Sequence, residues 1–171
     1  MTSTVTQTLQ VHRVYIKATP QAIWDAITKP EWTLRYGYGG TFDSDLRPGR
    51  PFKLLTDDNM KKSGAEMGYE VPDVAIDGEV LESNPPHKLV LTWRMVMDAG
   101  LAEEGFTRLT YEIKEIDGGY TKLTLIHDLT GAPQLAATVG GELDETQAGG
   151  GWPWVLSDLK TLLETGKSFR E

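Results

Sequence analysis

Residues 149–166 of the chain, GGGWPWVLSDLKTLLETG, carry the pattern that decides the fold. Apolar side chains recur there at spacings of three and four, and on a helix they fall within an arc of roughly 120°. The members of this arc are Trp152, Val155, Leu156, Leu159, Leu162 and Leu163. Glycines precede the pattern, and Gly166 follows it at a position where glycine often ends a helix. We therefore expect one long amphipathic helix over residues 151–166, with its apolar side covered by another part of the chain.

Other residues of this helix lie off the apolar arc, among them Trp154, Ser157 and Asp158. Trp154 lies roughly 160° from the centre of the arc, so it is either an exposed anchor for a protein partner or packed under segment 131–151. Ser157 and Asp158 also lie off the arc, and we expect both on a solvated face.

Length and composition indicate one globular domain of 171 residues with 39% hydrophobic residues, enough to bury a core. The absence of cysteine excludes thiol catalysis, disulfides and thiolate zinc sites. The formal net charge of −8 makes nucleic acid and anionic membrane surfaces poor partners. Without an apolar run near the roughly 20 residues of a membrane span, and without a signal pattern, we expect a cytoplasmic protein without membrane insertion.

The remaining segments predict strands with a few short helices. A helix is expected over 20–28, with Thr19 as its cap and Pro20 in its first turn, and a second over 31–36. Strands are expected over 9–17, 41–43, 51–56, 74–83, 89–97, 106–115 and 120–129. We expect loops over 57–73, 98–104 and 131–151. Hairpin turns between the later strands, with helices kept apart from them, indicate an α+β domain with an antiparallel sheet.

Three successive strands each have one apolar and one mostly polar face, because side chains alternate along a strand. The apolar faces hold Leu89, Leu91, Trp93, Met95 and Met97, then Thr107, Leu109, Tyr111 and Ile113, then Leu123, Leu125, His127 and Leu129. A sheet with one solvated face needs a cover on the other, and the helix over 151–166 supplies it.

His127 and the hydroxyl of Tyr111 are polar groups on this apolar face. A buried imidazole must have partners, since an unpaired polar group costs about 1–3 kcal/mol. His127 is either a core histidine bonded to a backbone carbonyl or to Tyr111, or it orients a ligand in an internal cavity. No phosphate-binding loop, dinucleotide fingerprint or metal-ligand spacing is found, so no cofactor or metal is expected.

Five segments in order give the chain a family resemblance. They are ATPQAIWDAIT at 18–28, PGRPF at 48–52, DGEVLE at 77–82 with PPHKLV at 85–90 and TW at 92–93, LTLIH at 123–127, and GW at 151–152 with Leu159 and Leu162. Together they resemble the proteins similar to the activator of heat-shock-protein-90 ATPase, a branch of the START-like (SRPBCC) superfamily. The resemblance covers nearly the whole chain.

The resemblance implies a helix-grip fold: a curved antiparallel sheet of about six to seven strands wrapped around a long C-terminal helix. It implies a single START-like domain over residues 1–171, with its core at 9–167, and a hydrophobic cavity between sheet and helix. In the wider superfamily that cavity holds lipids, sterols, polyketides or other apolar ligands, and some branches carry out cyclase or hydrolase chemistry.

We expect a binding protein for a small apolar or amphipathic molecule rather than an enzyme. The expected ligand-binding residues are Phe52, Trp93, Met95, Met97, Tyr111, Leu125, His127, Trp152, Leu156 and Leu159. Aromatic and methionine side chains make adaptable walls, and a few polar groups fix orientation. One alternative is a co-chaperone-like interaction module anchored by Trp154, with a chaperone partner. The other is a cyclase- or hydrolase-like enzyme with His127 and Tyr111 as catalytic groups. A homodimer is compatible with each of them.

Overall fold

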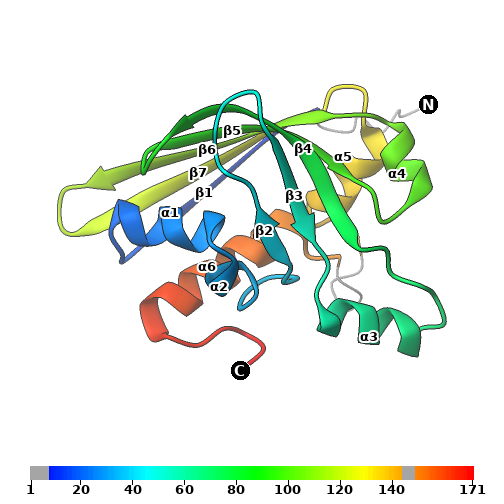
Figure 1. Cartoon of the computed structure of the whole chain (residues 1–171). Coiled ribbons are helices and arrows are strands. Elements are labelled where there is room, and N and C mark those ends of the chain that lie inside the picture. Colours follow the sequence, from blue (N-terminus) through cyan, green and yellow to red (C-terminus); the bar gives the residue numbers. More distant parts are fainter. Residues whose placement is uncertain (1–7, 144–148) are drawn as a thin grey trace, which may run out of the picture.

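The computed structural model describes residues 8–143 and 149–171. Within these residues, seven strands form one antiparallel sheet in the order β1-β7-β6-β5-β4-β3-β2 (Figure 1). The strands are β1 (Leu9–Ile16), β2 (Thr41–Asp43), β3 (Pro51–Leu55), β4 (Val74–Asn84), β5 (Lys88–Met95), β6 (Thr107–Ile116) and β7 (Tyr120–Asp128). The predicted α+β class and helix-grip architecture are confirmed.

The described residues form six helices: α1 (Pro20–Thr28), α2 (Pro30–Thr33), α3 (Asp58–Glu66), α4 (Ala99–Glu103), α5 (Pro133–Val139) and α6 (Gly151–Thr165). Figure 1 shows α1, α2 and α6 together on one side of the sheet, with α3 beyond one end of β3 and β4. Two short helices follow the first strand as expected, and the hydroxyl of Thr19 caps α1 by accepting from the amide of Ala22 at 3.1 Å.

Helix α6 is the long amphipathic helix that residues 149–166 predict. Leu156, Leu159 and Leu162 are between 1% and 5% exposed, and α6 contacts both β1 and α1. The helix ends at Gly166, whose φ of +84° is the left-handed conformation that glycine adopts without strain. The sheet and α6 therefore cover each other's apolar faces.

The inner and outer faces of the sheet are those expected from the alternation. Leu109 and Ile113 of β6 are 3% exposed or less, whereas Arg108, Glu112 and Lys114 on the opposite face of the strand are exposed. The core thus lies between the inner face of the sheet and the helices beneath it.

The expectation of loops is wrong in three places, where the structure has α3, α4 and α5. The carboxylate of Asp57 accepts from the amide of Met60 at 2.8 Å and caps α3. The carboxylate of Asp98 accepts from the amide of Leu101 at 3.1 Å and caps α4. Pro133 stands in the first turn of α5. These helices are short, and side-chain caps or an N-terminal proline mark their starts where apolar periodicity is weak.

Candidate ligand-binding site beneath the sheet

Three of the predicted ligand-binding side chains meet beneath the sheet. Trp93 comes from β5, His127 from β7 and Trp152 from the first turn of α6. The ring centroids are 5.1 Å apart for Trp93 and His127, 5.7 Å for the two tryptophans, and 6.0 Å for His127 and Trp152. The folding of the sheet onto α6 thus forms one aromatic cluster from three separate segments.

Both ring nitrogens of His127 are hydrogen-bonded. The indole Nε1 of Trp152 donates to His127 Nδ1 at 3.1 Å, and His127 Nε2 lies 2.8 Å from the hydroxyl oxygen of Thr107. The Thr107 hydroxyl donates its own proton to the carbonyl oxygen of Trp93 at 2.7 Å. His127 is 0% exposed, so in this conformation no ring nitrogen is open to a substrate.

Thr107 is the residue of this network that sequence reasoning did not single out. Neither of the partners suggested for His127, a backbone carbonyl or Tyr111, is the one found. The available signal was the position of Thr107 on the apolar face of its strand, where it pairs with Trp93. A buried hydroxyl on such a face needs a partner as much as an imidazole does.

Burial lowers the pKa of His127 from 6.5 to about 3, and nearby His12 acts in the same direction. The Asp128 carboxylate opposes this shift only weakly. The imidazole is therefore neutral at physiological pH, which matches its hydrogen bonds: one nitrogen accepts and the other donates.

The depressed pKa of His127 predicts a loss of stability on mild acidification. The unfolded chain takes up a proton near pH 6.5, whereas the folded state does not until about pH 3. The free energy of unfolding should therefore fall by roughly 2 kcal/mol between pH 7 and pH 5 from this residue alone. Urea unfolding of the wild type and of His127→Asn at both pH values measures the difference. His87→Asn, at an exposed turn, is the matched control and should keep the wild-type dependence; an equal dependence in His127→Asn would contradict the prediction.

Tyr111 lies on the inner face of β6 and is less buried than the residues that pair with it. It pairs with Leu89 and Leu125, and both of these are 0% exposed. Tyr111 keeps partial exposure, and its hydroxyl has no hydrogen-bond partner among the described residues. No buried side-chain nitrogen or oxygen in the described ranges lacks a partner. The Tyr111 hydroxyl oxygen is therefore not completely buried, although the burial of most of the side chain raises its pKa.

Tyr36, which follows α2, is a second tyrosine that sequence reasoning missed. Its hydroxyl donates to the carbonyl oxygen of Ala26 at 3.0 Å. Burial raises the pKa of Tyr36, with smaller contributions from nearby Tyr111 and Asp158. The segment after α2 therefore approaches the inner face beside Tyr111, and Tyr36 uses its hydroxyl there to hold α1.

The predicted ligand-binding residues fall into a filled group and an accessible group. The filled group is 7% exposed or less and consists of Phe52, Trp93, Leu125, His127, Leu156 and Leu159. The accessible group keeps partial exposure while packing on the core and consists of Met95, Met97, Tyr111 and Trp152. Phe52 stacks on Phe42 with centroids 5.6 Å apart, between β2 and β3. A ligand would therefore contact the side chains of the accessible group first, since those of the filled group are buried.

Asp158 of α6 is completely buried, so the expectation of a solvated face is wrong for this residue. Its carboxylate accepts from the amide of Gly37 at 2.8 Å and from the amide of Phe169 at 2.6 Å. The segment after α2 and the residues after α6 both fold over this side of the helix, which periodicity within the helix cannot reveal. Asp158 thereby ties three segments together.

Trp154 lies away from the sheet-facing side of α6 and is partly covered. Its ring stacks on Tyr38 at 5.0 Å and packs against Phe169 at 6.1 Å. Tyr38 and Phe169 are 38% and 49% exposed. We refer to these three residues as the surface aromatic stack. Of the segment 131–151, residues 144–148 lie outside the described residues, so packing of Trp154 under them is not tested.

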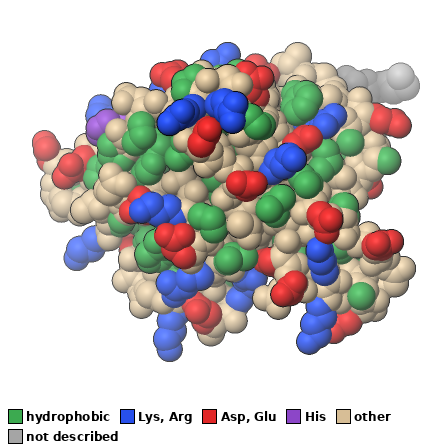
Figure 2. All heavy atoms as spheres, in the orientation of Figure 1, with side chains coloured by type: hydrophobic (Ala, Val, Ile, Leu, Met, Phe, Trp, Pro, Cys, Tyr) green, Lys and Arg blue, Asp and Glu red, His purple; other side chains and the backbone are tan. Residues whose placement is uncertain are grey.

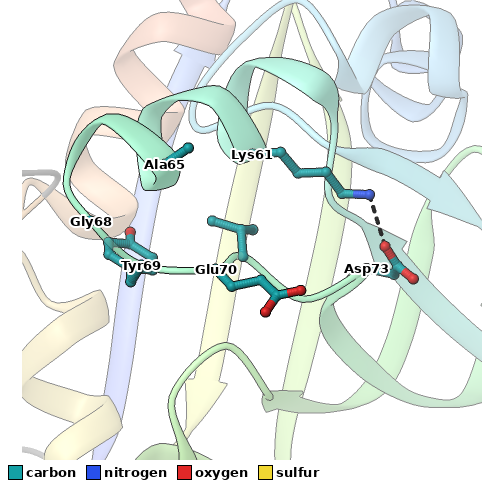
Figure 3. A pocket seen from close by; sticks show the side chains of 7 residues that line it. Lys61, Ala65, Gly68, Tyr69, Glu70 and Asp73 are labelled. Carbon is teal, nitrogen blue, oxygen red and sulfur yellow. Dashed lines mark hydrogen bonds and ion pairs between the residues drawn. The ribbon is translucent and has the colours of Figure 1, made fainter.

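Two hollows on the described surface lie apart from the predicted ligand-binding residues. The first encloses about 450 Å³ between α3 and the segment that follows it (Figure 3), and it is lined by Lys61, Ala65, Gly68, Tyr69, Glu70, Val71 and Asp73. The Lys61 ammonium and the Asp73 carboxylate form an ion pair at its edge, at 2.8 Å. The second encloses about 400 Å³ beside α6 and is lined by Tyr15, Lys17, Gly118, Tyr120, Lys160 and Glu164.

Three further features of the described residues bear on nucleic-acid, metal and membrane sites. Figure 2 shows acidic and basic side chains interspersed over one face, without a single large basic area. Within residues 8–143 and 149–171, no three histidine, aspartate or glutamate side chains come together as a metal site would require. None of the described helices is long and apolar enough to cross a membrane.

Several solved structures share this fold. CalU16 from Micromonospora echinospora is 22% identical with a TM-score of 0.61, over 92% of this chain and 77% of that one. The Aha1 dimer from Colwellia psychrerythraea is 18% identical with a TM-score of 0.64, over 95% and 100%. PFC0360w, an HSP90 activator from Plasmodium falciparum, is 22% identical with a TM-score of 0.54, over 96% and 92%. At these identities the likeness shows the fold alone.

Sequence comparison with protein families gives a match over most of the chain. No curated protein matches the sequence significantly. The model of the family described as Activator of Hsp90 ATPase homolog 1-like protein matches residues 17–164, from the end of β1 to the last turn of α6. The matched range includes strands β2 to β7, the aromatic cluster and Asp158. The protein is therefore a member of the Activator of Hsp90 ATPase homolog 1-like family.

Proposed function

We propose that the protein binds a small, uncharged, largely apolar molecule between the sheet and α6. The observation that carries this proposal is the Tyr111 hydroxyl, which is not completely buried and has no partner among the described residues, on a face that is largely apolar. A hydroxyl in this position orients a ligand by one hydrogen bond, while the surrounding apolar surface supplies most of the affinity.

The accessible group provides walls for such a ligand. Met95 and Met97 are flexible and polarisable, so they adapt to different shapes, and Trp152 offers a flat ring. Tyr111 is four residues from Thr107 along β6, which is roughly 13 Å in an extended strand. A ligand with a polar end at Tyr111 would therefore extend the rest of its molecule toward the aromatic cluster.

The charge of the ligand follows from the charge of the walls. None of the ten predicted ligand-binding residues is charged at neutral pH, since burial keeps His127 neutral. An ionised ligand would lose its hydration there without gaining an opposite charge, which is costly. These residues thus favour an uncharged ligand with few hydrogen-bonding groups.

The test uses two probes that differ in one hydroxyl, 2-naphthol and naphthalene. We expect the wild type to bind both in calorimetric or fluorescence titrations, with 2-naphthol bound more tightly. Tyr111→Phe should weaken 2-naphthol binding about five- to tenfold, the value of one hydrogen bond, and leave naphthalene binding unchanged.

The matched control is Tyr69→Phe, at an exposed tyrosine that lines the hollow beside α3. It should bind both probes as the wild type does. Absence of binding of either probe to the wild type at millimolar concentration would overturn the proposal. A loss of 2-naphthol affinity in Tyr69→Phe equal to that in Tyr111→Phe would move the site to that hollow.

The surface aromatic stack favours a second candidate function, interaction with a chaperone. Tyr38 and Phe169 expose aromatic surface around Trp154. Leu34, which lies between α2 and Tyr38 in the chain, is 41% exposed. Exposed aromatic clusters are frequent anchors of protein interfaces. The similar structures include an HSP90 activator and an Aha1 dimer. The family of this protein is named after the activator of Hsp90 ATPase.

An ATPase assay with the HSP90 of the same organism tests the second candidate. We expect the wild type to stimulate the ATPase and Phe169→Ala to stimulate it less, while Tyr69→Phe, which is outside the stack, should behave as the wild type. Neither binding nor stimulation by the wild type would exclude this function.

A further inference from the structure

The hydrogen bonds around His127 define a latent acceptor at the wall of the proposed site. We infer that His127 Nδ1 is a binding subsite for a hydrogen-bond donor of the ligand, such as a hydroxyl, and that the Trp152 indole occupies this subsite when no ligand is bound. This inference rests on the proposed function and adds to it the kind of polar group that the ligand carries.

The direction of each hydrogen bond follows from the chemistry of the groups. The carbonyl oxygen of Trp93 can only accept, so the single proton of the Thr107 hydroxyl is used there, at 2.7 Å. At the 2.8 Å contact with His127 Nε2, the Thr107 oxygen must therefore accept, and Nε2 must carry the ring proton. A neutral imidazole then has only a lone pair at Nδ1, to which the indole N–H of Trp152 donates at 3.1 Å.

The surroundings keep this arrangement fixed. Thr107 is 5% exposed, Trp93 is 7% exposed and His127 is 0% exposed, so water cannot readily replace a missing partner. A group that takes the place of the indole must itself be a donor, because an acceptor facing the Nδ1 lone pair would be repelled and leave that nitrogen unpaired. Ethers and ketones are therefore disfavoured at this position.

Trp152 is the one ring of the cluster that can give way. It alone of the three keeps more than slight accessible surface, and its side chain makes one hydrogen bond. It lies in the first turn of α6, directly after Gly151. A ligand hydroxyl that replaced the indole would keep the number of hydrogen bonds to His127 unchanged, while the indole N–H would turn to the accessible side.

The decisive variant is Trp152→Phe, which removes the indole N–H and leaves His127 Nδ1 without a donor. The probes are 2-naphthol, which can donate, and 2-methoxynaphthalene, which can only accept. Relative to the wild type, we expect Trp152→Phe to increase the preference for 2-naphthol over 2-methoxynaphthalene by about tenfold. Trp154→Phe, on the same helix but in the surface aromatic stack, is the matched control and should keep the wild-type preference.

Two readouts separate this inference from the proposed function. Long-range ¹⁵N NMR of the ligand-free protein should show His127 protonated at Nε2 in the wild type and in Trp152→Phe; protonation at Nδ1 would overturn the inference whether or not any ligand binds. If both probes bind but Trp152→Phe leaves their preference unchanged, the inference fails and the proposed function stands. If the NMR result is as expected and neither probe binds to any variant, the proposed function fails, and the inference fails with it.

Discussion

Asp158→Ala should lower the free energy of unfolding by about 3 kcal/mol, because it leaves the buried amide of Gly37 and the partly buried amide of Phe169 without their acceptor. The carboxylate of Asp158 is 0% exposed and accepts from the amides of Gly37 and Phe169. Both donors come from segments that lack regular structure, so neither has a strand or helix to supply another partner. Urea unfolding followed by circular dichroism measures the loss.

Ser157→Ala provides the matched control for Asp158→Ala on the same helix. Ser157 is exposed and donates to the carbonyl oxygen of Pro153, so its loss should change stability by less than about 0.5 kcal/mol. If Asp158→Ala were as mild as Ser157→Ala, the carboxylate would not be the connection between α6, the segment after α2 and the C-terminal residues.

Gly151→Ala should cost about 3 kcal/mol or more, for two reasons that act together. The φ of Gly151 is +59°, a left-handed conformation that costs an alanine about 1–2 kcal/mol. A Cβ atom there would also overlap the backbone carbonyl oxygen of Val139 and lie 2.6 Å from the amide nitrogen of Gly141. The start of α6 would have to move, and Trp152 with it.

Gly166→Ala separates these two contributions at the other end of α6. Gly166 also has a positive φ, +84°, but nothing lies within 4 Å of a Cβ added there. It should therefore cost only the conformational penalty, about 1–2 kcal/mol. Thermal or urea unfolding of both variants gives the comparison, and equal losses would show that close packing at Gly151 adds nothing to stability.

Most of the fold could be predicted from the sequence, because the spacing of apolar residues within single segments indicates which segments are helices and which are strands. The spacing of the leucines in 151–166 predicted α6, and the alternation in β6 and β7 predicted their inner faces. Helix α3 was missed because Gly64 is its one buried residue, so its apolar periodicity is weak. Its start was marked only by the capping carboxylate of Asp57.

The candidate site could be predicted only in part. Placing Trp93, His127 and Trp152 on surfaces that face each other was enough to bring them together. The pairing of His127 with Thr107, and of Asp158 with Gly37, depends on where distant segments meet in space. Such contacts leave no trace in the periodicity of one element, and this is why a buried aspartate resembled a solvated one.

Methyl NMR of protein labelled at its methionines tests the central claim most directly, because these residues report on separate places. Met95, the last residue of β5, and Met97, two residues beyond it, belong to the accessible group and pack against the core. Met67 is 69% exposed and lies in the chain between Ala65 and Gly68, which line the hollow at α3. On titration with 2-naphthol, we predict that the Met95 and Met97 methyl signals shift with one common dissociation constant and that Met67 stays unchanged. Shifts at Met67 with unchanged Met95 and Met97 would contradict a ligand site between the sheet and α6.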